Sequence, residues 1–273
     1  MQPLGFTLAA DPRDNQDALA LDEQDGIAVV VDGAGLPRDP EAGCRHPVSW
    51  YSRALAERYR DLLRDRALPI DEALALAIAQ VRALHPECRL DHTAPSATVA
   101  AFREADHLVE HLVLCDASIV LAFADGTVVE VTDDRLDRVV GPAEAGLADP
   151  TERLVRRLEA MHRTRNVPGG WWCCQHDPAA AFEALTGAHD LRELRGVIAA
   201  SDGATRGHQG LGLFELAHLA DEVLTGDAPR LAATIRATEE VRAEALRASA
   251  TKVHDDLSIA WAVTATSGRG PAR

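Results

Sequence analysis

The sequence predicts an α+β protein in which two packed antiparallel sheets are flanked by helices, a four-layer α-β-β-α sandwich. Runs of branched apolar residues follow one another at hairpin distances between residues 96 and 132, which favours antiparallel sheet over repeated βαβ units. Helical patterns come as a pair after the early strands and again before the last strand. No repeat or low-complexity linker divides the chain, so we expect one domain over residues 1–273.

The expected strands are short segments rich in branched apolar residues, which fit a pleated and partly buried surface. Asp125-Gly126, between two of them, suits a two-residue hairpin turn. The segments are 26–32, 96–102, 107–115, 118–124, 127–132, 196–201 and 257–264.

The expected helices have apolar residues at helical spacing. Asp71 can cap one of them, because its carboxylate can accept from free N–H groups of the first turn. Pro178 suits the first position of another. The segments are 49–66, 72–84, 151–162, 178–185 and 228–248.

Composition narrows the possible partners and the location. The net charge of −15, from 43 acidic and 28 basic residues, disfavours binding to nucleic acid and to anionic membranes. No apolar run approaches the roughly 20 residues that span a bilayer, and the N-terminus lacks the basic and apolar regions of a signal peptide. We therefore expect a cytoplasmic protein.

Five cysteines without a C-x-x-C pair favour reduced thiols in such a protein. Cys173, Cys174 and His176 lie close together, but their spacing matches no familiar zinc pattern. We expect no disulfide framework and no zinc at these three residues.

Acidic residues stand at the ends of three apolar strands. Asp32 and Asp202 each follow a strand and precede a glycine, and Asp255 directly precedes the last strand. A buried strand holds a carboxylate rigidly at its tip, and glycine lets the backbone approach a ligand closely. A single Asp-Gly is usually only a turn, as we expect at Asp125, but three acidic strand ends favour a shared site.

Carboxylates that converge repel one another, and a bound cation removes that conflict. All-oxygen ligands favour Mg²⁺ or Mn²⁺ over zinc. A pair of such ions is a common device for hydrolysing phosphate esters. The acidic strand ends therefore predict a phosphatase.

These motifs occur in an order that resembles the PP2C (PPM) family of protein phosphatases. The resemblance runs over about residues 5–265 and rests on order and spacing together, since each motif alone is weak. The matching segments are Arg13–Ala18, Val31–Gly35, Ser96–Thr98, Asp125-Gly126 with Val131–Asp134, Ala200–Gly203 and Asp255–Ser258.

The resemblance implies two Mn or Mg ions and a role for each matching residue. Asp32 would bridge both ions, the Gly33 carbonyl would bind one, and Asp202 and Asp255 would complete the other. Arg13 would grip the substrate phosphate with its planar fork, unless it is only a solvated loop arginine. Gln16, Asp17 and Asp256 would lie around the ions and support the residues that bind them.

The chain departs from the family pattern at three places. Gln16 stands where the motif has glutamate, and Leu36 where it has a second glycine. The acidic residue expected after the middle strand becomes Ala117 in one alignment and Asp116 after a one-residue slip. The resemblance implies that an additional metal can bind at this third position, which requires its acidic residue.

The implied reaction is hydrolysis of phosphoserine or phosphothreonine in proteins by a metal-activated water. One alternative is a phosphatase-like regulatory or binding protein that has lost turnover, which the departures favour. Another is a phosphatase for a small phosphorylated metabolite.

His46 is the candidate general acid that is nearest in sequence to Asp32, although a lone histidine is more often a packing residue. His254 would tune the metal site or merely lie on a loop.

Overall fold

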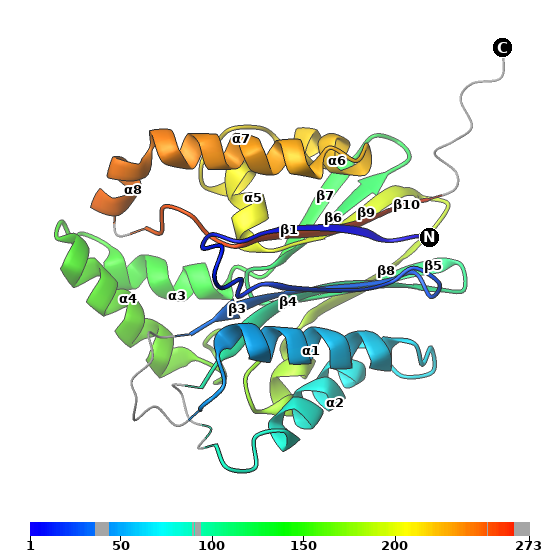
Figure 1. Ribbon diagram of the computed structural model, residues 1–273, viewed down its shortest axis with the longest axis horizontal. Helices are drawn as coiled ribbons and strands as arrows, with labels where there is room; N and C mark the ends of the chain where they lie inside the picture. Colours follow the sequence, from blue (N-terminus) through cyan, green and yellow to red (C-terminus); the bar gives the residue numbers. More distant parts are fainter. Residues whose placement is uncertain (36–43, 89, 91–93, 250, 265–273) are drawn as a thin grey trace.

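The computed structural model describes residues 1–35, 44–88, 90, 94–249 and 251–264. It confirms the predicted sandwich: two five-stranded antiparallel sheets lie face to face, and helices cover their outer faces (Figure 1). The first sheet has the order β1 (Leu4–Leu8), β10 (Leu257–Val263), β9 (Leu194–Ala200), β6 (Ser118–Phe123) and β7 (Val128–Thr132).

The second sheet is built around the long central hairpin of the chain. Every pair of neighbouring strands in it is antiparallel. Its order is β2 (Ala18–Asp22), β3 (Ile27–Ala34), β4 (Ser96–Ala105), β5 (Leu108–Leu114) and β8 (Leu185–Asp190).

The main core lies between the sheets because alternate side chains of each strand point to opposite faces. Val30 and Phe102 of the second sheet pack there with Ile119 and Val197 of the first, all fully buried. The other faces of the same strands pack on helices. The central strands of each sheet are therefore covered on both faces, which explains their nearly continuous apolar sequence.

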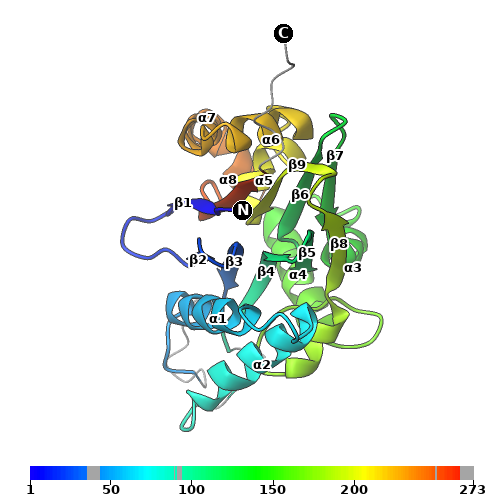
Figure 2. The same cartoon turned by 90° about the vertical axis from the view of Figure 1, so that its right-hand side faces the viewer.

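The helices form the two outer layers (Figure 2). The second sheet packs on α1 (Val48–Leu63) and α2 (Ile70–Ala83). The first packs on α5 (Asp202–Gln209), α6 (Leu216–Leu224) and α7 (Ala228–Val241). After α7 comes α8 (Ala243–Ala248), and α3 (Arg135–Glu144) packs with α4 (Pro150–Thr164) at one end of the sandwich.

The structure corrects several expected element boundaries. Residues 178–185 were expected to form one helix, but they form a 3-10 helix at Pro178–Glu183 and then enter β8. The expected helix 228–248 is interrupted at Arg242. The α2 helix begins at Ile70, so Asp71 lies in its first turn rather than at the N-cap, where its carboxylate accepts from the backbone N–H of Glu72 at 2.9 Å. The elements β1, β2, β8, α3, α5 and α6 were not predicted.

None of the helices within the described residues combines the length and the apolar character needed to cross a membrane.

Candidate active site

Asp32 lies near the end of β3, where the backbone is packed too tightly for a side chain at the next position. A Cβ on Gly33 would lie 2.3 Å from Ser52 Oγ of α1 and 2.5 Å from the backbone oxygen of Gln16. Glycine therefore lets α1 and the segment before β2 close around the strand end that carries Asp32.

Asp202 and Asp255 come from two neighbouring strands of the first sheet. Asp202 is the first residue of α5, just after β9, and Asp255 lies just before β10. A Cβ on Gly203 would lie 1.9 Å from the backbone oxygen of Asp256. The glycine that follows Asp202 is thus required for the two acidic segments to lie against each other.

Asp116 joins this group from the connection that crosses between the sheets. Cys115 adopts a left-handed conformation, with φ of 68°, directly before it. Burial and the charge of Asp202 raise the pKa of Asp116 to about 7. Ala117 packs instead in the core between the sheets. The one-residue slip is therefore the arrangement in the structure, with Asp116 on the acidic side.

The carboxylates converge on Asp32. Its pKa is raised well above the ordinary value by burial and then by the charges of Asp17, Asp202, Asp255 and Asp116. Burial and the charge of Asp202 likewise raise the pKa of Asp255. The side chain of Asp255 is still 20% exposed. The group is packed on most sides but still reaches solvent.

Asp17 is the most enclosed of these acids. Only 4% of the residue is exposed, and neither carboxylate oxygen has a hydrogen-bond partner of normal geometry. Burial and the charges of Asp256 and Asp202 raise its pKa to about 7, while the nearby hydroxyls of Ser258 and Ser201 oppose part of the rise. A carboxylate this buried among other acids has a charge that a bound cation would offset.

The raised pKa of Asp17 predicts how the metal-free protein responds to pH. The folded chain holds a proton that the unfolded chain releases above the ordinary value of 3.8, so this group destabilises the fold progressively as pH rises from 3.8 to about 7. Asp17→Asn should therefore stabilise metal-free protein at about pH 8 by at least about 1.4 kcal/mol, the equivalent of one pKa unit, and much less at about pH 4.

Urea unfolding of both proteins at the two pH values measures this difference. Asp125→Asn is the matched control, because the backbone N–H of Thr127 lowers the pKa of Asp125 and its effect should have the opposite sign. Equal effects of Asp17→Asn at both pH values would contradict the placement of Asp17.

Asp256 and Gln16 organise the segment before β2. Asp256 accepts hydrogen bonds from the backbone N–H groups of Ala10 and Gln16, each at 2.7 Å. Gln16 thus contributes its backbone to this contact. Arg13, in the same segment, has a side chain that is 88% exposed and forms an ion pair with Asp11 at 2.6 Å. Its grip on phosphate stays a prediction.

Lys252, the only lysine of the chain, places a cation beside the cluster. Its Nζ donates to Asp255 Oδ1 at 2.8 Å. Burial lowers the pKa of Lys252, but the charges of Asp255, Asp32 and Asp202 raise it by more. The ammonium offsets part of the acidic charge at the edge of the site.

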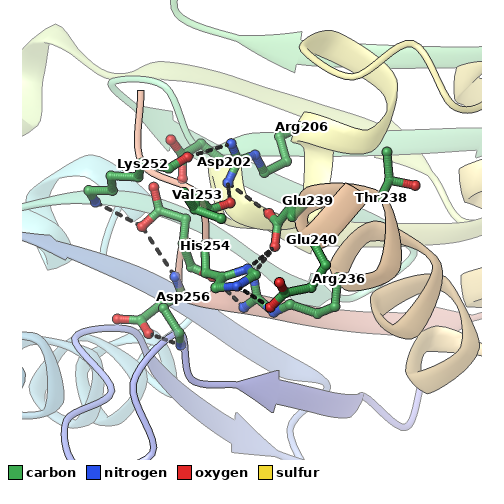
Figure 3. A network of polar contacts seen from close by, with 12 residues as sticks. Asp202, Arg206, Arg236, Thr238, Glu239, Glu240, Lys252, Val253, His254 and Asp256 are labelled. Carbon is green, nitrogen blue, oxygen red and sulfur yellow. Dashed lines mark hydrogen bonds and ion pairs between the residues drawn. The ribbon is translucent and has the colours of Figure 1, made fainter. Parts of the chain in front are cut away.

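A buried ionic network holds the loop that carries Asp255 (Figure 3). Glu239 of α7 is fully buried and accepts from Arg206, Arg236 and His254, each at 2.7 Å. The two arginines donate onward to backbone oxygens of this loop: Arg206 to Lys252 at 3.1 Å and to Val253 at 3.4 Å, and Arg236 to Asp255. Sequence reasoning missed this network because its members are far apart in the chain.

The candidate histidines His254 and His46 contact glutamate, tryptophan and cysteine side chains. His254 lies between Glu239 and Glu240 of α7. His46 stacks on Trp50, with ring centroids 4.0 Å apart, and its Nδ1 faces Cys44 and Cys88. Leu36 lies outside the described residues.

The donor set fits hard divalent cations. Asp32, Asp202 and Asp255 offer carboxylate oxygens from three segments, and the Gly33 carbonyl can add a neutral oxygen. Oxygen-only sites of this kind suit Mg²⁺ or Mn²⁺. Burial and mutual repulsion raise the pKa values of Asp32, Asp255, Asp17 and Asp116, and a bound cation would relieve that repulsion.

The chain is thus a four-layer α-β-β-α sandwich with a cluster of carboxylates at its strand ends. Residues 9–244 match the family described as protein phosphatase 2C, and the chain belongs to that family. No curated protein matches the sequence. The full-chain fold is nevertheless similar to several solved bacterial structures.

The serine/threonine phosphatase Stp1 from Staphylococcus aureus is 11% identical with a TM-score of 0.54, covering 96% of this chain and 94% of that one. The serine/threonine phosphatase PstP/Ppp of Mycobacterium tuberculosis is 15% identical with a TM-score of 0.54, covering 96% and 97%. The catalytic domain of PstP in complex with two manganese ions is 14% identical with a TM-score of 0.52, covering 96% and 97%. At such identities the likeness concerns the fold.

Proposed function

We propose that this chain is a metal-dependent phosphatase that hydrolyses phosphoserine and phosphothreonine in proteins. The observation that carries the proposal is the convergence of four aspartates on Asp32, within a chain of the protein phosphatase 2C family. We further propose that it acts in the cytoplasm as a single domain.

Asp32, the Gly33 carbonyl, Asp202 and Asp255 would hold two Mn or Mg ions. When bound, the ions supply a water of lowered pKa and neutralise charge on the phosphoryl oxygens. Asp116 would add one more carboxylate at the side of Asp202. Asp17, Asp256 and Gln16 would surround these ligands and hold them in position.

The remaining task of the site is to bind the phosphate. Arg13 suits it because a guanidinium can donate two parallel hydrogen bonds to an oxyanion. Its present partner is the exposed carboxylate of Asp11. Exposed ion pairs contribute little, so substrate phosphate can replace Asp11 at small cost.

The competing function is a phosphatase-like regulatory protein without turnover. Gln16 favours it, since an amide attracts cations less than the glutamate of the family motif. The converged aspartates oppose it. Hydrolysis of an aryl phosphate with and without Mn²⁺ separates the two: we expect hydrolysis only with the ion. Complete inactivity with Mn²⁺ and with Mg²⁺ would favour the regulatory protein.

The substrate class gives a separate prediction. A surface with net charge −15 should disfavour acidic phosphopeptides and accept neutral or basic ones. We expect basic flanks to raise kcat/KM at low salt, with the advantage shrinking as salt is added. The measurement compares matched phosphothreonine peptides with basic and acidic flanks against a panel of sugar and nucleotide phosphates. A preference for one small metabolite, with the peptides untouched, would overturn the protein substrate and keep the metal site.

A further inference from the structure

A cluster of two cysteines and two histidines lies apart from the aspartates. Cys44 and His46 precede α1, whereas His85 and Cys88 follow α2. One ligand atom from each of the four residues lies within 4.8 Å of all the others. Across the described residues, no other group of three or more histidine, cysteine or acidic side chains is gathered as tightly.

Three sulfur–nitrogen distances inside the cluster match those of a tetrahedral metal shell. Cys44 Sγ lies 3.8 Å from His46 Nδ1 and 3.4 Å from His85 Nδ1, and Cys88 Sγ lies 3.6 Å from His46 Nδ1. Zinc bonds of about 2.3 Å to sulfur and about 2.0–2.1 Å to nitrogen, at tetrahedral angles, separate the two ligand atoms by about 3.6 Å. All three separations are close to that value.

The surrounding residues hold the ligands in this arrangement. The backbone N–H of Cys88 donates to the backbone oxygen of His85 at 3.1 Å, and this turn brings both side chains to one side. Trp50, in the first turn of α1, stacks on His46 and meets the His85 ring edge-on, with centroids 4.7 Å apart. His85 itself is only 5% exposed. The imidazole rings are therefore fixed by packing as well as by their contacts with sulfur.

We propose that Cys44, His46, His85 and Cys88 bind one zinc ion in a closed structural site. Thiolate and imidazole ligands select zinc over the Mg²⁺ or Mn²⁺ that the oxygen ligands of the aspartate cluster favour. Four protein ligands leave no open position for a water, so the site is not a second catalytic centre. The sequence signal is two short ligand pairs, C-x-H and H-x-x-C, on separate segments.

The site would join the two helices that cover the second sheet. One ligand pair stands at the start of α1 and the other just past the end of α2. Val48 at the start of α1 also lies against Gly33, since a Cβ there would be 2.5 Å from Val48 Cγ1. Zinc would thus fix the helix end that packs behind Asp32. Because the unfolded chain lacks the assembled shell, zinc should also stabilise the fold.

Metal analysis and cobalt spectroscopy test the proposal on the full chain. Protein produced in zinc-supplemented medium should contain about one zinc per chain. Cobalt exchanged into the wild type should give the intense visible bands of a tetrahedral ion and a thiolate-to-cobalt charge-transfer band. Cys88→Ser and His85→Asn should weaken zinc binding at least about 10–100-fold, the loss typical of even an outer partner, and should lower Tm.

The controls separate this site from the aspartates. Asp32→Ala should keep its zinc, and so should His218→Asn, which changes an exposed histidine of α6. If the cysteine and histidine variants do not fold, a thiol-blocking mercurial added to wild-type protein should release the zinc to a colorimetric chelator. Wild-type protein without zinc and without tetrahedral cobalt bands would overturn the proposal, as would zinc that is lost in Asp32→Ala and kept in Cys88→Ser. These readouts do not depend on phosphatase activity.

Discussion

Asp32→Ala should lower Mn-dependent hydrolysis of an aryl phosphate by at least about 100-fold, because loss of merely an outer partner of a metal ligand already costs about 10–100-fold. Asp32 is the acid on which the charges of Asp17, Asp202, Asp255 and Asp116 all act. We therefore expect it to matter most for binding the two proposed ions. Steady-state kinetics across a Mn²⁺ titration measure the loss, and calorimetry shows whether ion binding falls with it.

The fold itself should tolerate this change. Asp32 is one of several acids that repel one another without metal, so its removal should leave metal-free protein as stable as before or more stable. Asp125→Ala, in the exposed hairpin turn, is the matched control and should keep full activity. Near-normal turnover in Asp32→Ala would show that the ions bind elsewhere.

The central sheet strands could be predicted from sequence because they are covered on both faces. Strands such as β3 and β9 are continuous apolar runs, and their Asp-Gly ends stand out against them. The edge strands β1 and β8 carry mixed, partly exposed residues and have no such contrast. Their strand character comes from pairing with a neighbour, which local sequence does not encode.

The position of three acidic residues at strand ends could be predicted for the same reason, and their role as metal ligands stays a prediction. Asp32, Asp202 and Asp255 lie at strand ends, and the structure brings these three together. Which of Asp116 and Ala117 joins the site could not be predicted. That choice depends on the left-handed conformation of Cys115, in the connection between the two sheets. Sequence spacing alone does not reveal which of two adjacent side chains points outward.

The ionic network and the cysteine–histidine cluster could not be predicted because each joins distant segments. Glu239 meets Arg206 only because α7 packs on α5. The two C-x-H and H-x-x-C pairs are short and individually common, and only the packing of α1 on α2 brings them together. Cys173, Cys174 and His176, which lie close together in the sequence, are not part of this cluster.

Glu239→Ala should lower the free energy of unfolding by about 3–5 kcal/mol, the usual result of removing one partner from a buried ion pair. Glu239 is fully buried, whereas the side chains of Arg206 and Arg236 are 14% and 18% exposed. The alanine would leave two mostly buried guanidinium groups facing each other without the carboxylate between them. Urea unfolding with and without the substitution measures the cost.

Glu240→Ala is the matched control, because this neighbour also contacts His254 but has a side chain that is 71% exposed. It should cost no more than about 1 kcal/mol, as expected for an exposed ion pair.

Glu239→Ala should also raise the Mn²⁺ concentration needed for half-maximal hydrolysis, since Arg206 and Arg236 would no longer hold the loop that presents Asp255. Equal stability losses in the two variants would show that Glu239 is not the centre of the network. A large loss of stability in Glu239→Ala with unchanged Mn²⁺ dependence would show instead that the network supports the fold without positioning Asp255.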